Sequence, residues 1–369
     1  MTADAVAVAP NRTLRLLGRE IPVILPRRDD PRLRLAVVIG ALQVLGQVGL
    51  GFRVSIAQIL VTIAVCAAIE VGVGWRRQHA LVWPASAMLT GNSTAFILRA
   101  SGTAHGDWWS LNGIEWFVLA AVLGLLSKYL LRLGGRHVFN PSNAGLVLVL
   151  LLVGPLHVYP QWLWWGPMSP AVAAALVVIA AGGVWVLRPL RMWPMAAAFG
   201  LTFGVAVGAI AAGGQCFDAI WRPDSICGSD YWLTVCASPE VLVFVLFMMS
   251  DPRTSPGGPW PRALFGAATA AVAAGLIFAQ PSEYGIKVAL LAALTVVCAV
   301  RALARAGGQL VGGRRGFPER AAGLLTSPAL IAVTLIGFTV PGLVLRLASD
   351  QAVLAIDRGE APRGAQSPQ

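Results

Sequence analysis

The chain is divided into apolar blocks of about 20 residues, the length that a helix needs to cross the hydrocarbon core of a bilayer. Candidate spans lie at 35–52, 54–74, 79–98, 113–133, 142–158, 168–187, 193–213, 231–249, 263–279, 285–300 and 327–347. Only 12% of the residues are charged, whereas a soluble chain carries about a quarter. The sequence therefore predicts an all-α polytopic membrane protein with about ten or eleven transmembrane helices.

The positions of arginine predict the orientation of these spans. A basic arm without the apolar stretch of a cleavable signal peptide precedes the first span. Further arginines follow every second span, at 76–77, 132–136, 188–191, 253–262 and 301–320. The alternate connections carry aromatic residues of the kind that prefer the headgroup level, namely Trp108, Trp109, Tyr159, Trp162, Trp164 and Trp165. We expect a multi-pass protein of the inner (plasma) membrane with a cytoplasmic N-terminus.

The expected organisation follows from the same pattern. It comprises a cytoplasmic basic arm (1–34), a transmembrane core (35–305), a cytoplasmic linker (306–326), an additional transmembrane helix (327–347) and a polar tail (348–369). The net charge of +11 is spread over the connections, which argues for lipid and against nucleic acid as a partner. No Gly-rich loop follows a strand, and the histidines and cysteines form no metal motif, so we expect no metal site.

Two of the candidate spans, 79–98 and 231–249, contain helix breakers and polar residues. Pro84 and the polar run from Thr90 to Thr94 interrupt the first, while Pro239 and Glu240 interrupt the second, which ends in the polar segment 250–256. Backbone groups without hydrogen bonds cost several kcal/mol each in lipid. We therefore expect both broken spans to be buried in protein or to face a polar cavity, where a ligand can bind.

A short internal repeat relates the two halves of the core. The hexapeptide at 140–145 (NPSNAG) opens one span, and the hexapeptide at 280–285 (QPSEYG) opens another. An odd number of spans separates them, so the two copies point in opposite directions across the membrane. A broken span lies upstream of each copy. This pattern predicts two inverted five-helix repeats with a binding site between them, near the middle of the bilayer.

Three motifs resemble those of the RnfD/NqrB family. The segment 126–131 (LSKYLL) with 136–141 (RHVFNP) is similar to the family's turn and FNPA signature, and 247–256 (FMMSDPRTSP) resembles its FFMATDP…TSP segment. The segment 281–285 (PSEYG) falls where the family has YPEG. The motifs occur in the family's order, and the resemblance covers about residues 80–305. Relatives of this family also occur as stand-alone members in actinomycete natural-product clusters, including those for enediynes, and the Arg-rich arm and the additional span after 305 suit such a member.

The resemblance implies a membrane subunit of an ion-pumping, flavin-dependent electron-transfer complex such as Rnf or the sodium-translocating NADH:quinone reductase. Such a subunit has ten helices in two inverted repeats, typically carries FMN esterified to a Thr, and works with other redox membrane subunits. Here the corresponding loop, 154–170, contains no Thr, and Ser169 is its only Ser. The nearest similar triplet, Ser101–Thr103, lies in another loop. We therefore expect the flavin, FMN or riboflavin, to be bound non-covalently.

The candidate cofactor-binding residues are the polar groups of the broken spans and of the first repeat copy: Thr90, Gly91, Asn92, Asn140, Pro141, Ser142, Asn143, Asp251, Arg253, Thr254 and Ser255. Asn, Ser and Pro before a span also suit helix capping. A helix start nevertheless attracts phosphate or a ring carbonyl, and capping does not require three polar residues. The segment 251–255 is either a turn that stops a helix or the polar end of a ligand cleft.

Two charged residues lie inside candidate spans. Glu70 is either functional or a partner of Arg76 near the helix end, and Lys128 is either functional or extends toward the headgroups. Among the cysteines, Cys216 and Cys227 share an outward connection where a disulfide is permitted, and Cys236 competes for it.

The sequence favours flavin-dependent transmembrane electron transfer as the function, with a biosynthetic pathway as one setting for it. Two alternatives remain open. A small-molecule or ion transporter would use the same cavity between inverted repeats, and a scaffold subunit would hold no cofactor. No catalytic residue is assigned.

Overall fold

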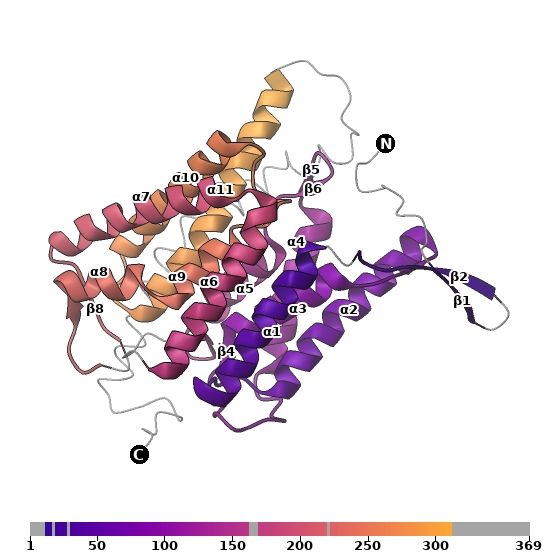
Figure 1. The fold of residues 1–369 in the computed structure, drawn as a ribbon, viewed down its shortest axis with the longest axis horizontal. Helices are drawn as coiled ribbons and strands as arrows, with labels where there is room; N and C mark the ends of the chain where they lie inside the picture. Colours follow the sequence, from indigo (N-terminus) through magenta and orange to yellow (C-terminus); the bar gives the residue numbers. More distant parts are fainter. Residues whose placement is uncertain (1–11, 17–18, 28–29, 162–168, 220–221, 312–369) are drawn as a thin grey trace.

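The computed structural model describes residues 12–16, 19–27, 30–161, 169–219 and 222–311 (Figure 1). It is mostly helical in this part. The helices are α1 (Pro31–Gly49), α2 (Ile56–Gln78), α3 (Ala85–Ile97), α4 (Ile114–Leu130), α5 (Pro141–Val153), α6 (Pro170–Leu190), α7 (Trp193–Ala212), α8 (Gly228–Cys236), α9 (Pro239–Val243), the π-helix η1 (Phe244–Met248), α10 (Pro259–Phe278) and α11 (Glu283–Val311).

The lengths and composition of the helices confirm a polytopic membrane protein at this coarse level. In the described residues, 7 helical segments are long and apolar enough to cross a membrane: α1, α2, α6, α7, the run from α8 to η1, α10 and α11. The expected number of about ten or eleven spans is neither confirmed nor excluded, because 327–347 lies outside the described residues. So do the tail 348–369 and most of the linker 306–326, into which α11 extends.

The predicted full-length spans at 79–98 and 142–158 are wrong in extent. Helix α3 begins only at Ala85, directly after Pro84, and both α3 and α5 have 13 residues. Each is followed by a short strand, β4 (Leu98–Ala100) after α3 and β7 (Val158–Pro160) after α5. The two strands pair antiparallel, so their backbone groups are hydrogen-bonded inside the protein, where lipid cannot reach β4.

The second broken span, 231–249, is interrupted as expected. Helix α8 ends at Cys236, and α9 restarts after Ser238, whose hydroxyl accepts a hydrogen bond from the N–H of Val241 (3.3 Å). Pro239 occupies the first turn of α9, where its missing N–H is not needed. The turn that follows is the π-helix η1, a form that is rare and concentrated at functional sites.

The basic arm contains a hairpin that the sequence analysis did not predict. Strand β1 (Arg12–Leu16) pairs antiparallel with β2 (Arg19–Ile24), and β2 pairs in parallel with β3 (Leu81–Val82). The hairpin projects from the helical bundle beside α2 (Figure 1). The arm is therefore attached to the connection between α2 and α3.

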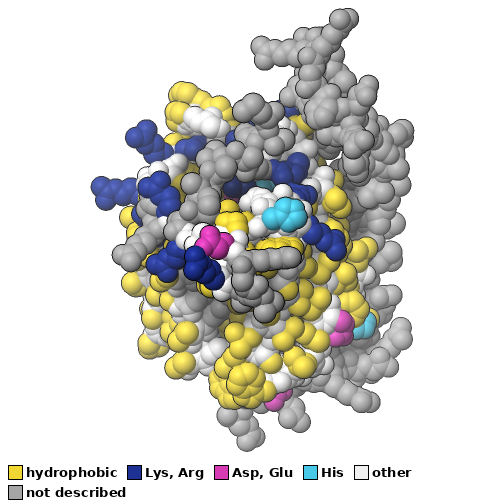
Figure 2. All heavy atoms as spheres, turned by 90° about the vertical axis from the view of Figure 1, so that its right-hand side faces the viewer, with side chains coloured by type: hydrophobic (Ala, Val, Ile, Leu, Met, Phe, Trp, Pro, Cys, Tyr) yellow, Lys and Arg dark blue, Asp and Glu magenta, His cyan; other side chains and the backbone are white. Residues whose placement is uncertain are grey.

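The arginine-rich connections meet at one end of the bundle, which we call the basic end. The contacts that join them are Arg77 over the Tyr129 ring (5.6 Å), Arg136 to Pro252 O, Arg262 to Leu190 O (2.9 Å) and Arg301 to Thr254 O. In Figure 2, Lys and Arg side chains gather in the upper part of the face shown, above a broad hydrophobic surface. The strands β4 and β7 lie at the other end of the bundle. Ala100 of β4 contacts Gly113 directly before α4, whereas Tyr129 near the last residue of α4 belongs to the basic end.

The two halves of the core touch through corresponding helices. Helix α1 packs against α6, and α5 packs against α11, while α4 packs on α5 as α10 packs on α11. Glycine permits the closest approaches: a Cβ at Gly145 of α5 would lie 2.0 Å from the carbonyl oxygen of Ala120 in α4, and one at Gly266 of α10 would lie 2.2 Å from that of Met195 in α7. The inverted repeat itself remains a prediction.

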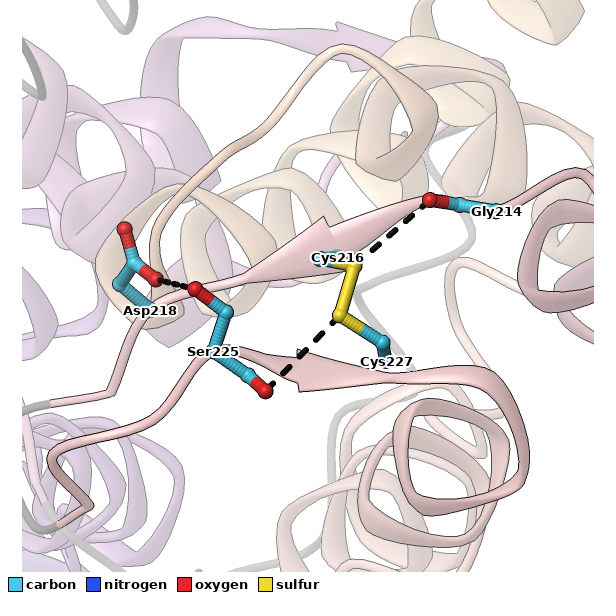
Figure 3. The surroundings of a disulfide bond; sticks show 5 residues. All are labelled: Gly214, Cys216, Asp218, Ser225 and Cys227. Atoms are coloured by element: carbon cyan, nitrogen blue, oxygen red, sulfur yellow. Dashed lines mark hydrogen bonds between the residues drawn. A yellow bond between two sulfur atoms is a disulfide. The ribbon is translucent and has the colours of Figure 1, made fainter.

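A disulfide closes the loop between α7 and α8. Cys216 in β8 (Cys216–Phe217) is bonded to Cys227 in β9 (Ile226–Cys227), and the two strands pair antiparallel (Figure 3). The Ser225 hydroxyl donates to the Asp218 carboxylate (2.6 Å) beside it. Cys236 is free, so the possibility that it competes for the disulfide is excluded.

Candidate functional site

Two polar segments from different halves meet at the basic end. One is the stretch 136–143, which leads into α5, and the other is 247–255, which follows η1. The Nδ2 of Asn140 donates to the carbonyl oxygen of Met248 (2.8 Å), and Nε2 of His137 lies 3.0 Å from Oδ2 of Asp251. These segments are two of the three that carry the family resemblance. The sequence of neither segment indicates that the other is its partner.

Local sequence explains how the first segment reaches this place. Gly134 and Gly135 both have positive φ (58° and 81°), which L-residues rarely adopt, and they form the turn between β5 (Arg132–Leu133) and β6 (Arg136–His137). Asn140 then caps α5, with Pro141 in the first turn. The hairpin directs His137 toward the second half while the cap fixes the start of α5.

Capping accounts for part of the polar cluster at the start of α5. Oδ1 of Asn140 accepts hydrogen bonds from the Ser142 hydroxyl (2.9 Å) and from the N–H of Asn143 (3.3 Å). The Asn143 side chain is not a cap: its Nδ2 donates to Leu291 O (3.0 Å) and to Oγ1 of Thr295 (2.9 Å) in α11. Asn143 therefore ties the two halves together, and its Oδ1 is buried without a hydrogen-bond partner.

The second segment is a tight turn built on Asp251. Its main-chain carbonyl oxygen accepts from the hydroxyls of Thr254 (3.2 Å) and Ser255 (2.9 Å), and its Oδ1 accepts from the N–H of Arg253 (2.9 Å). Burial raises the pKa of the Asp251 carboxyl, but the hydrogen bonds from His137 and Arg253 outweigh burial and hold the pKa below its usual value. Asp251 is therefore a carboxylate at neutral pH.

The first broken span does not reach this turn. Thr90, Gly91 and Asn92 lie inside α3, so the helix breaks at Pro84 and not at the polar run. The Thr90 hydroxyl donates to Ser86 O (3.0 Å), and none of the three residues hydrogen-bonds to 250–255. Thr90 instead lies near the start of α5, because its Cγ2 and the carbonyl oxygen of Pro141 flank the same point on α4. Asn92 is buried, with its Oδ1 unpartnered.

Glu70 and Lys128 bind each other rather than extending to the surface. Nζ of Lys128 lies 2.7 Å from Oε1 of Glu70 and donates to the Ser86 hydroxyl (3.1 Å). The second carboxylate oxygen of Glu70 accepts from the N–H of Ala87 (2.6 Å), which stabilises the first turn of α3. The interpretations of Glu70 as a partner of Arg76 and of Lys128 as a headgroup-facing residue are wrong.

An open pocket adjoins this pair at the basic end. It measures about 660 Å³, its mouth included, and is lined by Glu70, Val73, Gly74, Arg77, Gln78, Val82, Lys128, Tyr129, Arg132, His137 and Arg253. Burial and the charge of nearby Arg253 lower the pKa of Arg132, so cations are crowded here. Of the predicted cofactor residues, Arg253 alone lines this pocket. We call it the Glu70–Arg253 pocket.

A second buried ionic cluster lies nearer the other end, and the sequence analysis missed it. Nζ of Lys287 in α11 lies 2.6 Å from Oε1 of Glu283 and 3.1 Å from Oε1 of Glu240 in α9, with side chains exposed by 5%, 6% and 10%. Lys287 also donates to Gln161 O (3.4 Å). The spacing of Glu283 and Lys287, four residues apart on a helix, was the available signal. We call this group the Lys287 cluster.

The Lys287 cluster borders a largely apolar cavity between the two halves. Its walls include Ile97 at the end of α3, Phe244 in η1 and Leu291 in α11, and Gln161 contributes an amide. Nε2 of Gln161 is buried without a hydrogen-bond partner. The broken helices of both halves therefore do enclose a cavity with polar groups.

The described residues contain no group of three or more His, Cys, Asp or Glu side chains arranged to hold a metal ion. Comparison with protein-family models and with curated proteins gave no match.

Proposed function

We propose that the chain is a plasma-membrane protein of the RnfD/NqrB type that takes part in flavin-dependent transmembrane electron transfer, with a biosynthetic pathway as one setting for that activity. The observation that carries this proposal is the contact of 136–143 with 247–255. Both segments resemble family motifs, they come from opposite halves, and Asn140 and His137 join them directly. A chance resemblance gives no reason for the two motifs to meet.

The lining of the Glu70–Arg253 pocket suits the chemistry of a flavin ring. A flavin ring presents carbonyl oxygens and ring nitrogens, and the ammonium of Lys128 and the guanidinium groups of Arg132 and Arg253 are donors. Tyr129 supplies an aromatic wall. When bound, a flavin exchanges one or two electrons, and these cations would favour its reduced, anionic form.

The hydroxyl groups near the outer end favour non-covalent binding. Oγ1 of Thr103 is buried and accepts hydrogen bonds from Gln58 (3.1 Å) and Asn112 (3.2 Å). The Ser169 hydroxyl accepts from the N–H of Val172 (3.2 Å) and caps α6. Both hydroxyls have structural partners, which argues against esterification to a flavin phosphate.

The inverted repeat, the orientation and the partners belong to the same proposal. Pairing of α1 with α6 and of α5 with α11 supports two equivalent halves. Collection of the arginine-rich connections at one end supports a cytoplasmic basic end, and the disulfide on the other side suits an oxidising compartment. Other redox membrane subunits would supply and remove the electrons.

Transport is the second candidate function, and the Lys287 cluster favours it. Charged side chains inside a membrane are costly and commonly mark substrate or ion pathways. Here Glu240 and Lys287 line a cavity between broken helices, as in carriers built from inverted repeats, and Glu283 binds the same ammonium. An ion or small molecule moving between the halves would pass this cluster. A scaffold subunit without a cofactor would need neither the Glu70–Arg253 pocket nor the Lys287 cluster.

The visible spectrum of the purified full-length protein separates these functions. Electron transfer predicts flavin absorption bands that bleach with dithionite and are lost after acid precipitation. Arg253→Gln should reduce the flavin-to-protein ratio, whereas Arg188→Gln, an exposed arginine at the same end, should not. If the protein is purified with riboflavin and FMN present throughout and is nevertheless colourless, the proposal that it binds a flavin is refuted. Solute uptake by vesicles containing that colourless protein would then support transport.

A further inference from the structure

A second pocket at the basic end is strongly cationic and adjoins the Glu70–Arg253 pocket, with which it shares His137 and Arg253. It measures about 300 Å³ with its mouth, and its lining residues are Leu133, Arg136, His137, Val138, Arg253, Thr254, Cys298, Arg301, Ala302 and Arg305. The lining contains no carboxylate. Arg136 comes from the β5–β6 hairpin, whereas Arg301 and Arg305 are one turn apart on α11. Cations from three segments therefore converge on one hollow.

The arginines of this pocket keep donors available for a ligand. Arg136 donates to Pro252 O and Arg301 to Thr254 O, both neutral carbonyl groups. A guanidinium carries five N–H donors, so most of each fork remains. Within the described part of the chain, neither these two nor Arg305 forms an ion pair with a carboxylate. The carboxylate of Asp251, in the adjoining turn, is bound to His137 and to the N–H of Arg253.

The positive charges of arginines that line one pocket repel one another. An anion bound between them attracts each guanidinium and offsets this repulsion. Arginine forks match the geometry of phosphate oxygens and form short, charge-assisted hydrogen bonds with them. Leu133, Val138 and Ala302 add an apolar wall beside the cations. Basic pockets between transmembrane helices are sites for acidic lipid headgroups.

We propose that this pocket binds a phosphate group through Arg136, Arg301 and Arg305. Two sources share that chemistry: the headgroup of an anionic phospholipid, whose glycerol and chains would lie on the apolar wall, and a soluble phosphate. These three arginines do not line the Glu70–Arg253 pocket, although His137 and Arg253 line both pockets, so the proposal rests on residues that the flavin proposal does not use.

Binding to the full-length, delipidated protein in neutral detergent tests the proposal. The probes are short-chain phosphatidylglycerol, the corresponding phosphate-free diacylglycerol, and inorganic phosphate, titrated while intrinsic Trp fluorescence or native mass reports occupancy. We expect saturable binding of phosphatidylglycerol at one site and none of diacylglycerol. Arg301→Gln and Arg305→Gln should each weaken binding about tenfold, which corresponds to about 1.4 kcal/mol.

The control is Arg188→Gln, which removes an exposed arginine from the same end without touching the pocket. Arg305 is exposed and makes no hydrogen bond or ion pair in the described chain, so its substitution should leave folding intact. Equal affinity for inorganic phosphate would identify a soluble phosphate as the ligand, and tighter binding of the lipid would identify a headgroup. Failure of both probes to saturate, or an equal effect of Arg188→Gln, would overturn the proposal. Flavin content plays no part in either result.

Discussion

Substitution of Lys287 by Met tests whether the buried ionic cluster is the interaction that its geometry indicates. The ammonium lies between two carboxylates, at 2.6 Å from Glu283 and 3.1 Å from Glu240, and all three side chains are at least nine-tenths buried. Removing one partner of a buried ion pair costs about 3–5 kcal/mol, because the remaining charge is left uncompensated. Here two carboxylates would be left, so we expect a cost at the upper end of that range.

Neutral partners should reverse much of this loss. In the triple variant with Glu240→Gln and Glu283→Gln added to Lys287→Met, the Lys287 cluster no longer carries a charge, and such replacements are often close to neutral. We therefore expect the triple variant to be more stable than Lys287→Met alone. The single variant Glu240→Gln should fall between the two, because Lys287 keeps Glu283.

Thermal unfolding in detergent, followed by the fluorescence of the chain's 13 tryptophans, measures this order. A change of 1 kcal/mol shifts the melting temperature by about 2–4 °C in a domain of 150–250 residues, so Lys287→Met should lower it by at least about 5 °C. Arg188→Met, at an exposed position, is the control and should change stability by no more than about 0.5 kcal/mol. Wild-type stability of Lys287→Met, or a triple variant less stable than it, would refute the reasoning.

Further outcomes follow from other contacts. The pKa of Asp251 lies below its ordinary value of 3.8 in the folded protein, so its contribution to stability is present above that value and is lost as the pH falls through the folded pKa. Melting temperatures of Asp251→Asn should accordingly depend less on pH than those of the wild type below about pH 5, and equal slopes would contradict this. Gly145→Ala should destabilise the protein by about 1–3 kcal/mol, since its methyl group would displace α4. Gly200→Ala should stabilise it by about 0.5–1 kcal/mol, because a Cβ at Gly200 would meet no atom within 4 Å. The reverse order of melting temperatures would refute the close packing at Gly145. Replacing both cysteines of the β8–β9 disulfide by Ser should cost about 2–4 kcal/mol, and alkylation of these cysteines in the unreduced wild type, detected by mass spectrometry, would show that the disulfide is absent.

The sequence predicts those parts of the fold that depend on local properties. Apolar length and the alternation of arginine locate the long helices, and capping residues such as Asn140 and Ser238 mark where helices restart. The short length of α3 and α5 does not follow from local sequence. It depends on the pairing of β4 with β7, two segments about 60 residues apart in the chain whose partnership no local pattern encodes.

The candidate site shows the same division. The segments around Asn140 and Asp251 were identified from composition and resemblance, but the hydrogen bond to Met248 and the partnership of His137 with Asp251 needed coordinates. The first broken span was placed in the site because Thr90 to Thr94 are polar. Tertiary packing instead keeps that run helical and directs Gly91 against α2, where a Cβ would lie 2.8 Å from the carbonyl oxygen of Thr62.

The buried ion pairs were the hardest features to predict. Glu70 and Lys128 are 58 residues apart, whereas the local sequence indicates only Arg76 as a partner for Glu70 and the headgroups as a partner for Lys128. Glu240 was recognised only as a helix breaker, whereas in the structure it binds Lys287 on another helix.

Cross-linking in native membranes tests most directly whether the two motif segments meet. In a variant whose free cysteines are replaced by Ser, Cys would be placed at His137 and Asp251, treated with a short thiol-reactive linker and analysed by mass spectrometry of the linked peptides. The contact between the segments predicts an efficient 137–251 cross-link and little product from the control pair 137–188. A missing 137–251 product, or equal yields from both pairs, would contradict the site.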